Sequence, residues 1–207
     1  MKQTIIVTGT DTDVGKTVFA AALTRALGAF YWKPVQAGDD DGGDKDRVAA
    51  LGVPKQRILP EAYRLKTPCS PHRAARIDGI TIDLAQLVLP GGAGPLVVEG
   101  AGGALVPVTD DVLYADIFAQ WGAPAVIVAA TRLGTINHSL LTIEALRARK
   151  VSILGVAFVG EPEPDSEATV CAIGKVARLG RLPRLASLTP QSLGDAFAAN
   201  FETGQFL

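Results

Sequence analysis

The stretch Gly9-Thr10-Asp11-Thr12-Asp13-Val14-Gly15-Lys16-Thr17 stands between an apolar run, residues 4–8, and an alanine-rich helical pattern. A strand, a glycine-containing turn and a helix in this order predict a phosphate-binding loop, because backbone N–H groups and the positive helix end gather at one point. Lys16 then reaches the outer phosphates, and the Thr17 hydroxyl can ligate the accompanying magnesium ion. The stretch therefore predicts a nucleoside triphosphate site.

One position departs from the usual phosphate-binding loop. Counting back from Lys16, the usual first glycine position holds Thr10, and Gly9 lies one residue further out. The strand before and the helix after still favour a phosphate loop over a chance Gly-Lys-Thr. We expect the nucleotide to contact the loop and first turn, namely Thr12, Asp13, Val14, Gly15, Lys16, Thr17 and Val18.

Composition limits the class of protein. The chain has 207 residues, of which 48% are hydrophobic, and a net charge of −1. This size predicts a single domain over residues 1–207. With no basic stripe, we expect no nucleic-acid or anionic-membrane partner. Two distant cysteines, no signal-like segment and no apolar run of membrane-spanning length predict a soluble cytoplasmic protein.

Apolar strands alternate with helical patterns along the chain. This order predicts an α/β protein with a mostly parallel sheet and helices on both faces, the P-loop NTPase fold. The predicted strands are residues 4–8, 30–33, 96–99, 125–130 and 153–158, with a short one near 184–185. The predicted helices are residues 16–27, 45–51, 83–89, 114–120, 136–149, 166–179 and 191–201, with another that begins at Ser70-Pro71.

Ligands of such sheets bind beyond the carboxyl ends of the strands, so residues that follow strands are candidates. Lys33 ends an apolar run and is followed by Pro34. There it brings a second cation beside Lys16, which suits a reaction that builds negative charge. The alternative is a lysine whose stem lies along the sheet edge and whose ammonium group reaches solvent.

Two acidic segments are candidates for holding magnesium. Residues 39–46 form an aspartate-rich loop that we expect to be solvated, except for Asp46, which opens a predicted helix. Glu99 follows three apolar strand residues and precedes Gly100-Ala101-Gly102-Gly103. A carboxylate after an apolar strand is the second signature of phosphate-loop enzymes, where it holds magnesium directly or through water. The alternative for Glu99 is a structural acid before a glycine-rich turn.

A further helix start could bind a substrate carboxylate. Gly134 and Thr135 precede a long predicted helix, whose free N–H groups favour an anion. His138 and His72 each stand alone, and structural hydrogen bonding is favoured over acid–base chemistry for both.

With these pieces assembled, the chain closely resembles the dethiobiotin synthetase family. The segments that carry the resemblance are residues 9–17, Lys33-Pro34-Val35, Ser70-Pro71-His72, residues 98–103 and residues 133–138. Gly-Lys-Thr alone is weak evidence, whereas these segments in this order are specific. They span roughly residues 4–142, and the remainder agrees in length and element order.

The resemblance implies a homodimeric ligase that converts 7,8-diaminononanoate, CO2 and ATP into dethiobiotin, ADP and phosphate. It implies that a carbamate oxygen attacks the γ-phosphate and that the neighbouring amine then closes the ring. By the same resemblance, Thr17, Asp46 and Glu99 hold Mg²⁺, and Thr12 and Asp13 face the junction of diamine and phosphate. Lys16, Lys33 and Thr12 are the catalytic residues that it implies. The substrate would contact Asp13, Lys33, Ala37 and, from across the dimer, Gly134, Thr135 and Asn137.

Three positions depart from the family pattern. Asp13 stands where some relatives have glutamate, and Ala37 replaces a frequent hydroxyl residue. Val159 stands where relatives often carry an asparagine that reads adenine, and valine has neither donor nor acceptor. We expect base recognition to come from backbone near Gly160–Pro162 or around Leu182-Pro183, so that Gly160 and Pro183 contact the nucleotide, or else to be relaxed.

Other phosphate-loop proteins remain as alternatives. Partition- and septum-site ATPases usually place an additional lysine early in the loop, where this chain has Thr10-Asp11-Thr12. A GTP switch protein would need an Asn-Lys-x-Asp segment, which the sequence lacks. A cofactor amidoligase shares the fold and is harder to exclude, although Lys33-Pro34-Val35 with residues 99–103 favours the dethiobiotin synthetase interpretation.

Overall fold

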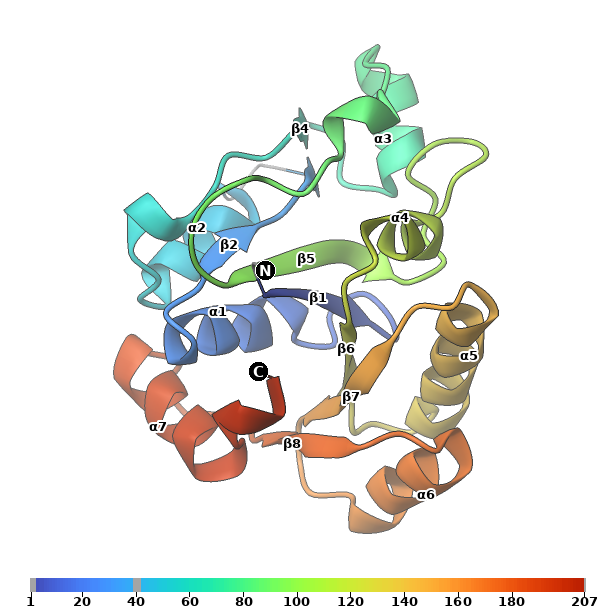
Figure 1. Ribbon diagram of the computed structural model, residues 1–207. Coiled ribbons are helices and arrows are strands. Elements are labelled where there is room, and N and C mark those ends of the chain that lie inside the picture. Colours follow the sequence, from blue (N-terminus) through green and yellow to red (C-terminus); the bar gives the residue numbers. More distant parts are fainter. Residues whose placement is uncertain (1–2, 39–41, 207) are drawn as a thin grey trace.

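The computed structural model describes residues 3–38 and 42–206, and its centre is a six-stranded parallel sheet (Figure 1). The strand order is β2-β5-β1-β6-β7-β8. Adjacent strands run parallel throughout, so all their carboxyl ends lie at one edge. The strands are β1 (Thr4–Gly9), β2 (Phe30–Trp32), β5 (Leu96–Gly103), β6 (Ala125–Ala130), β7 (Ile153–Val159) and β8 (Arg178–Leu182).

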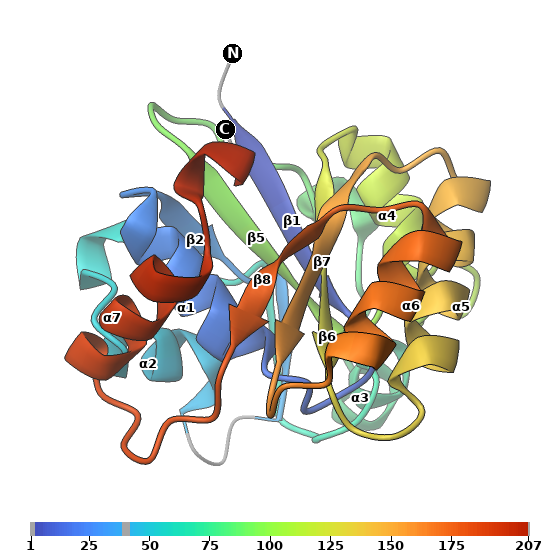
Figure 2. The same cartoon turned by 90° about the horizontal axis from the view of Figure 1, so that it is seen from below.

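Helices cover both faces of this sheet (Figure 2). One face carries α1 (Lys16–Ala26), α2 (Gly43–Ala50) and α7 (Pro190–Asn200). The other carries α3 (Pro71–Asp78), α4 (Tyr114–Trp121), α5 (Thr135–Ala148) and α6 (Pro164–Gly174). Strand side chains alternate between the two cores, as buried parallel strands require: Ile5 and Val7 face α1, and Ile6 faces the opposite layer.

Short elements complete the described chain. A second, two-stranded parallel sheet pairs β3 (Val35–Ala37) with β4 (Tyr63–Leu65). Three 3₁₀ turns, η1, η2 and η3, cover Lys55–Arg57, Leu84–Gln86 and Thr203–Phe206. Among the described residues, no helix combines the length and apolar character needed to cross a bilayer.

The register of the central strands places the site. Val7 of β1 lies opposite Glu99 of β5, and Tyr31 of β2 lies opposite Val97. Glu99 follows Val97 by two residues and therefore faces α1, whose first turn begins directly after the loop that follows β1. The acid after the apolar strand and the phosphate loop thus meet at the carboxyl edge.

The α/β class, the parallel sheet and most elements agree with the sequence prediction, and three details are wrong. The last strand covers Arg178–Leu182 and not residues near 184–185, and the helix predicted to reach residue 179 ends at Gly174. Residues 83–89 form only a 3₁₀ turn over Leu84–Gln86, because Pro90 disfavours helix at the residue before it. Asp39, Asp40 and Asp41 of the predicted solvated loop lie outside the described residues.

Candidate active site

The phosphate loop joins β1 to α1 through a left-handed turn. Gly15 is the N-cap of α1 with a φ of 92°, and Asp13 has a φ of 55°. The Lys16 ammonium group turns back over the loop and donates a hydrogen bond to the Asp11 carbonyl, 2.9 Å away. The loop is therefore folded around Lys16, whose side chain lies at the pocket wall.

Packing against Lys16 explains why a glycine stands at position 9. A Cβ on Gly9 would lie 2.9 Å from the Lys16 Nζ atom and 2.9 Å from the Asp11 carbonyl oxygen. Any larger residue would push Lys16 out of the loop. Gly9 thus provides close packing under the lysine, which explains how a loop with Thr10 at the usual glycine position still closes.

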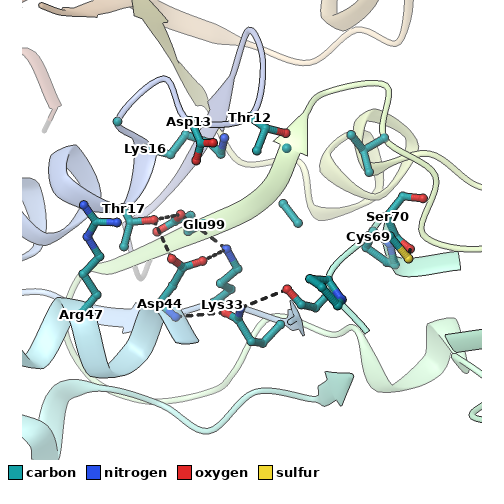
Figure 3. A pocket seen from close by; sticks show the side chains of 18 of the residues that line it. Thr12, Asp13, Lys16, Thr17, Lys33, Asp44, Arg47, Cys69, Ser70 and Glu99 are labelled. Carbon is teal, nitrogen blue, oxygen red and sulfur yellow. Dashed lines mark hydrogen bonds and ion pairs between the residues drawn. The ribbon is translucent and has the colours of Figure 1, made fainter. Parts of the chain in front are cut away.

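Four side chains meet at the mouth of the loop (Figure 3). The Thr17 hydroxyl lies 3.0 Å from Oδ1 of Asp44 and 2.7 Å from Oε1 of Glu99. The Lys33 ammonium group donates a hydrogen bond to Asp44 and lies 3.6 Å from Oε1 of Glu99. Glu99 is fully buried and Lys33 is nearly so, so these charges interact away from bulk water.

The oxygen atoms of this cluster fit a hard divalent cation. A hydroxyl group has one proton, so Thr17 cannot donate to Asp44 and Glu99 at once. Oδ1 of Asp44 and Oε1 of Glu99 therefore converge on one hydroxyl oxygen whose single proton serves only one of them, and Mg²⁺ favours such oxygen donors. In the described part of the chain, no three histidine, cysteine or carboxylate side chains gather as a metal cluster, so the remaining ligands would be phosphate oxygens and water.

The pKa values of Lys16 and Lys33 are shifted in opposite directions. Burial lowers the pKa of Lys16, and Glu99 offsets this only in part. Burial acts on Lys33 in the same direction, but the carboxylates of Glu99 and Asp44 outweigh it and raise the pKa of Lys33 above its ordinary value. Burial alone would raise the pKa of Asp44, yet the neighbouring Lys33 holds it below the usual range. Lys33 is consequently a fixed positive charge at neutral pH.

These residues line a pocket of about 600 Å³. Its opposite wall is the segment Pro68-Cys69-Ser70-Pro71 before and at the start of α3. Asp78 at the end of α3 holds this segment: it accepts a hydrogen bond of 2.6 Å from the Thr67 hydroxyl and another of 2.6 Å from the backbone N–H of Lys66. The pocket is thus bounded by a phosphate loop on one side and a clamped loop on the other.

The structure brings most of the predicted site residues together. The pocket is lined by the predicted residues Thr12, Asp13, Gly15, Lys16, Thr17, Val18, Lys33, Ala37 and Glu99. It is not lined by the predicted residues Val14, Asp46, Gly134, Thr135, Asn137, Gly160 and Pro183. Of these, Val14 is buried in the core under the loop, where only its backbone can face a phosphate.

The structure places Asp44, and not Asp46, beside Thr17 and Glu99. Asp44 and Val48 are four residues apart in α2 and share the inward face, where Val48 is fully buried. Asp46 lies two residues on from Asp44, about 200° around the helix, and is exposed. Helix geometry therefore places Asp44, and not the predicted Asp46, in this cluster.

Gln36 was missed by the sequence analysis although it fixes Asp44. Its side-chain oxygen accepts a hydrogen bond of 3.1 Å from the backbone N–H of Asp44, and its amide donates to the Gly38 carbonyl at 2.8 Å. A buried glutamine three residues after Lys33 gave no periodic signal. The other lining residues were not predicted as site residues, although Ser70-Pro71, Ala101 and Gly102 belong to segments that carry the family resemblance: Arg47, Pro68, Cys69, Ser70, Pro71, Ala101, Gly102 and Val106.

Val159 packs against the phosphate loop. A Cβ on Gly15 would lie 2.9 Å from Val159 Cγ1, so the valine side chain packs closely against the backbone of the phosphate loop. The next residue, Gly160, donates its N–H to the Leu182 carbonyl at 3.0 Å, and its carbonyl accepts from Arg181 at 2.8 Å. The Gly160 N–H is therefore already used within the protein.

A second, smaller pocket of about 260 Å³ adjoins the first, and Thr12 and Val106 line both. It continues to His138 and Leu141 of α5. Two of its lining residues, Leu105 and Leu141, are large, apolar and exposed. Leu133, which precedes α5, is also exposed but does not line this pocket. Gly134 and Asn137 at the start of α5 are exposed, whereas Thr135 is buried.

Comparison with known proteins gives consistent sequence matches. A family model described as "AAA domain" matches residues 3–192. A protein of Novosphingobium aromaticivorans named ATP-dependent dethiobiotin synthetase BioD is 66% identical over 202 residues, covering 97% of this chain and 98% of the relative. A protein of the same name from Rhodopseudomonas palustris is 62% identical over 208 residues, covering 100% and 98%.

Solved structures support the fold alone. The septum site-determining protein MinD of Pyrococcus horikoshii, complexed with Mg-ADP, superposes with a TM-score of 0.56 at 14% identity and covers 100% of this chain and 89% of its own. A ParA family ATPase of Chlorobium tepidum gives a TM-score of 0.52 at 10% identity, covering 96% and 98%. At these identities the likeness shows a shared P-loop architecture and says nothing about partners.

Proposed function

The chain belongs to the AAA-domain family and, within it, to the ATP-dependent dethiobiotin synthetases, and from this premise we propose how its pocket performs the reaction. The protein is an ATP-dependent ligase of biotin biosynthesis. Its substrates are 7,8-diaminononanoate, CO2 and ATP, and its products are dethiobiotin, ADP and phosphate. One observation supports placing this reaction in the pocket: the buried ammonium group of Lys33 lies beside the phosphate loop, where Asp44 and Glu99 hold it.

The reaction requires two anions to meet. One amine of the substrate captures CO2 as a carbamate, with loss of a proton. A carbamate oxygen then forms a bond to the γ-phosphorus while the bond to the β-γ bridging oxygen breaks and ADP leaves. The second amine attacks the carbonyl carbon of the mixed anhydride and gives up a proton, the C–O bond to the phosphoryl group breaks, phosphate departs, and the cyclic urea closes.

Lys16 and Lys33 would compensate the repulsion between carbamate and γ-phosphate. At an effective dielectric constant near 20, one pair of unit charges at 4 Å interacts by about 4 kcal/mol. Lys16 lies in the loop that cradles the phosphates, and Lys33 projects into the same pocket from the end of β2. Because both cations are held in place before substrate arrives, little reorganisation is needed as charge develops.

Thr17, Asp44 and Glu99 are proposed to hold Mg²⁺, with Asp44 in the place first expected for Asp46. When bound, the ion would neutralise charge on the phosphate oxygens. The donor set supports this, because oxygens of two carboxylates and one hydroxyl converge at one point. Thr12 and Asp13 are exposed in the loop, where the diamine would meet the phosphate, and Ala37 lines the same pocket.

We further propose that the 207 residues form a single domain, that the protein works in the cytoplasm and that it is a homodimer. The smaller pocket and the exposed Leu105 and Leu141 support a self-association surface beside the substrate site. Gly134, Thr135 and Asn137 of one protomer would then hold the substrate carboxylate at the other, since the start of α5 is a helix N-terminus.

Product analysis tests the function directly. The purified protein is mixed with the diamine, ¹³C-bicarbonate, MgCl2 and ATP, and the product is identified by mass spectrometry. We expect labelled dethiobiotin, formed in equal amount with ADP and phosphate, and none when the diamine or ATP is omitted. ATP hydrolysis that proceeds equally with and without the diamine would indicate a generic nucleotide hydrolase. Replacing Mg²⁺ with EDTA in the same assay tests the metal requirement separately.

A further inference from the structure

Tyr31 makes a buried contact with the acid of the site that the reaction chemistry does not itself require. Its hydroxyl donates a hydrogen bond of 2.9 Å to Oε2 of Glu99, and both residues are fully buried. A phenol carries one proton, and Tyr31 donates it to Glu99.

The strand geometry explains this contact. Tyr31 lies opposite Val97 in the β2–β5 pairing, and Glu99 is two residues further along β5. Side chains two apart in a strand share a face, so Tyr31 and Lys33 from one strand end and Glu99 from the next all point to the α1 side. Lys33 and Tyr31 thus reach the same carboxylate from neighbouring positions of one segment.

The two oxygens of Glu99 have separate partners. Oε1 faces the Thr17 hydroxyl at 2.7 Å and the Lys33 ammonium group at 3.6 Å, whereas Oε2 faces Tyr31. The last side-chain torsion of glutamate is broad, so a carboxylate without such a partner can rotate. A hydrogen bond on Oε2 fixes this rotation and leaves Oε1 directed at the phosphate loop.

We propose that Tyr31 is a positioning residue for the cation site: its hydroxyl orients Glu99 so that Oε1 alone faces Thr17 and the bound Mg²⁺. This role rests on the proposed placement of Mg²⁺ at Thr17, Asp44 and Glu99. Groups that orient ligating carboxylates typically change metal affinity by about 10–100-fold when they are removed. The aromatic ring itself belongs to the buried core cluster that also contains Phe19 and Val97, so it fills space independently of the hydroxyl.

The variant Tyr31→Phe removes the hydroxyl and keeps the ring. Tyr63→Phe makes the same chemical change outside the pocket lining and serves as the control: the Tyr63 hydroxyl accepts a hydrogen bond of 2.8 Å from the backbone N–H of Asp83 and donates one of 3.4 Å to the Asp83 carbonyl. Both variants lose the hydrogen bonding of a tyrosine hydroxyl, so both are expected to unfold at a somewhat lower temperature. Only Tyr31→Phe is expected to affect the cation.

The readouts are Mn²⁺ binding to the ADP complex by electron paramagnetic resonance, and the Mg²⁺ concentration that gives half-maximal dethiobiotin synthesis. For Tyr31→Phe we expect the dissociation constant for Mn²⁺ and the half-maximal Mg²⁺ concentration each to rise about 10-fold, with the KM for the diamine unchanged. Wild-type-like Mn²⁺ binding by Tyr31→Phe, with the same loss of thermal stability as Tyr63→Phe, would make Tyr31 purely structural and overturn the proposal. A wild-type ADP complex that binds no Mn²⁺ would remove the proposed cation site itself, which is a different and recognisable failure.

Discussion

Asp44 and Glu99, 55 positions apart in the chain, contact the same hydroxyl group, that of Thr17, at 3.0 and 2.7 Å. One comes from the second position of a short helix and the other from the middle of a buried strand. The acidic pair and the phosphate loop therefore form one unit, in which Lys33 supplies the positive charge between the acids.

Replacing Asp44 by Asn should weaken Mg²⁺ binding, because the substitution removes one of two anionic ligands. We expect the Mg²⁺ concentration for half-maximal activity to rise at least about 10-fold. Asp46→Asn is the matched control, since it makes the same chemical change two residues away on the exposed face of α2. A larger effect of Asp46→Asn than of Asp44→Asn would restore the original sequence prediction.

Replacing Lys33 by Gln should slow turnover by roughly 10²–10³-fold, as the loss of a fixed charge donor does. The KM for ATP is expected to change much less, because the loop and Lys16 remain. The measurement is dethiobiotin formation under saturating substrates, with circular dichroism to establish that the variant is folded. Wild-type turnover in a folded Lys33→Gln protein would remove Lys33 from the mechanism and leave it as a partner of Asp44 only.

The sequence contained the central features because their signals are local. The nonapeptide at residues 9–17, the lysine after β2 and the acid in β5 each follow an apolar strand, and parallel strands bring their carboxyl ends together. The three apolar residues before Glu99 were enough to predict that it lies on a strand of the sheet. In the structure, Glu99 pairs with Val7 of β1, which places it beside the phosphate loop that follows β1.

The features that the sequence did not reveal depend on tertiary contacts. Asp44 and Asp46 differ only in which side of α2 they occupy, and that is set by the burial of Val48. The spacing of Asp44, Val48 and Leu51 at i, i+4 and i+7 was the available signal. Gln36 and the three-residue strands β3 and β4 gave none, because such short segments have no readable periodicity.

The proposed dimer makes a complementation prediction. If Asn137 acts across the interface, each active site takes Lys33 from one protomer and Asn137 from its partner. Lys33→Gln and Asn137→Ala therefore remove groups that different protomers supply to one site. In a mixed dimer one of the two sites then carries both defects and the other carries neither. Co-expressed variants should therefore recover roughly one quarter of wild-type activity, measured at low diamine concentration. Activity no greater than the average of the two separate variants would contradict a shared site, and light scattering would show whether dimers form at all.

Nucleotide selectivity is expected to be relaxed. Val159 offers no hydrogen bond to a base, and the Gly160 N–H is occupied by Leu182. We expect kcat/KM values for ATP, CTP and GTP that lie within about one order of magnitude, since sites gain strong discrimination from buried groups that pair with the base edge. Val159→Asn should favour ATP. A strict ATP preference in the wild-type protein would show that another backbone group reads the base.

The loop opposite the phosphates depends on Asp78, whose pKa is held below its ordinary value of 3.8 first by the Thr67 hydroxyl and then by the N–H groups of Lys66 and Thr67. A carboxyl group with a depressed folded-state pKa stabilises the protein above its unfolded pKa, and the contribution disappears as the pH falls through the folded value. Asp78→Asn should therefore lower the urea midpoint at about pH 6, and the difference from wild type should shrink below about pH 4. Because Pro68, Cys69 and Ser70 follow the clamped residues, the same variant should raise the KM for the diamine and leave the KM for ATP unchanged. Equal urea midpoints at both pH values, with an unchanged diamine KM, would show that the loop holds its shape without Asp78.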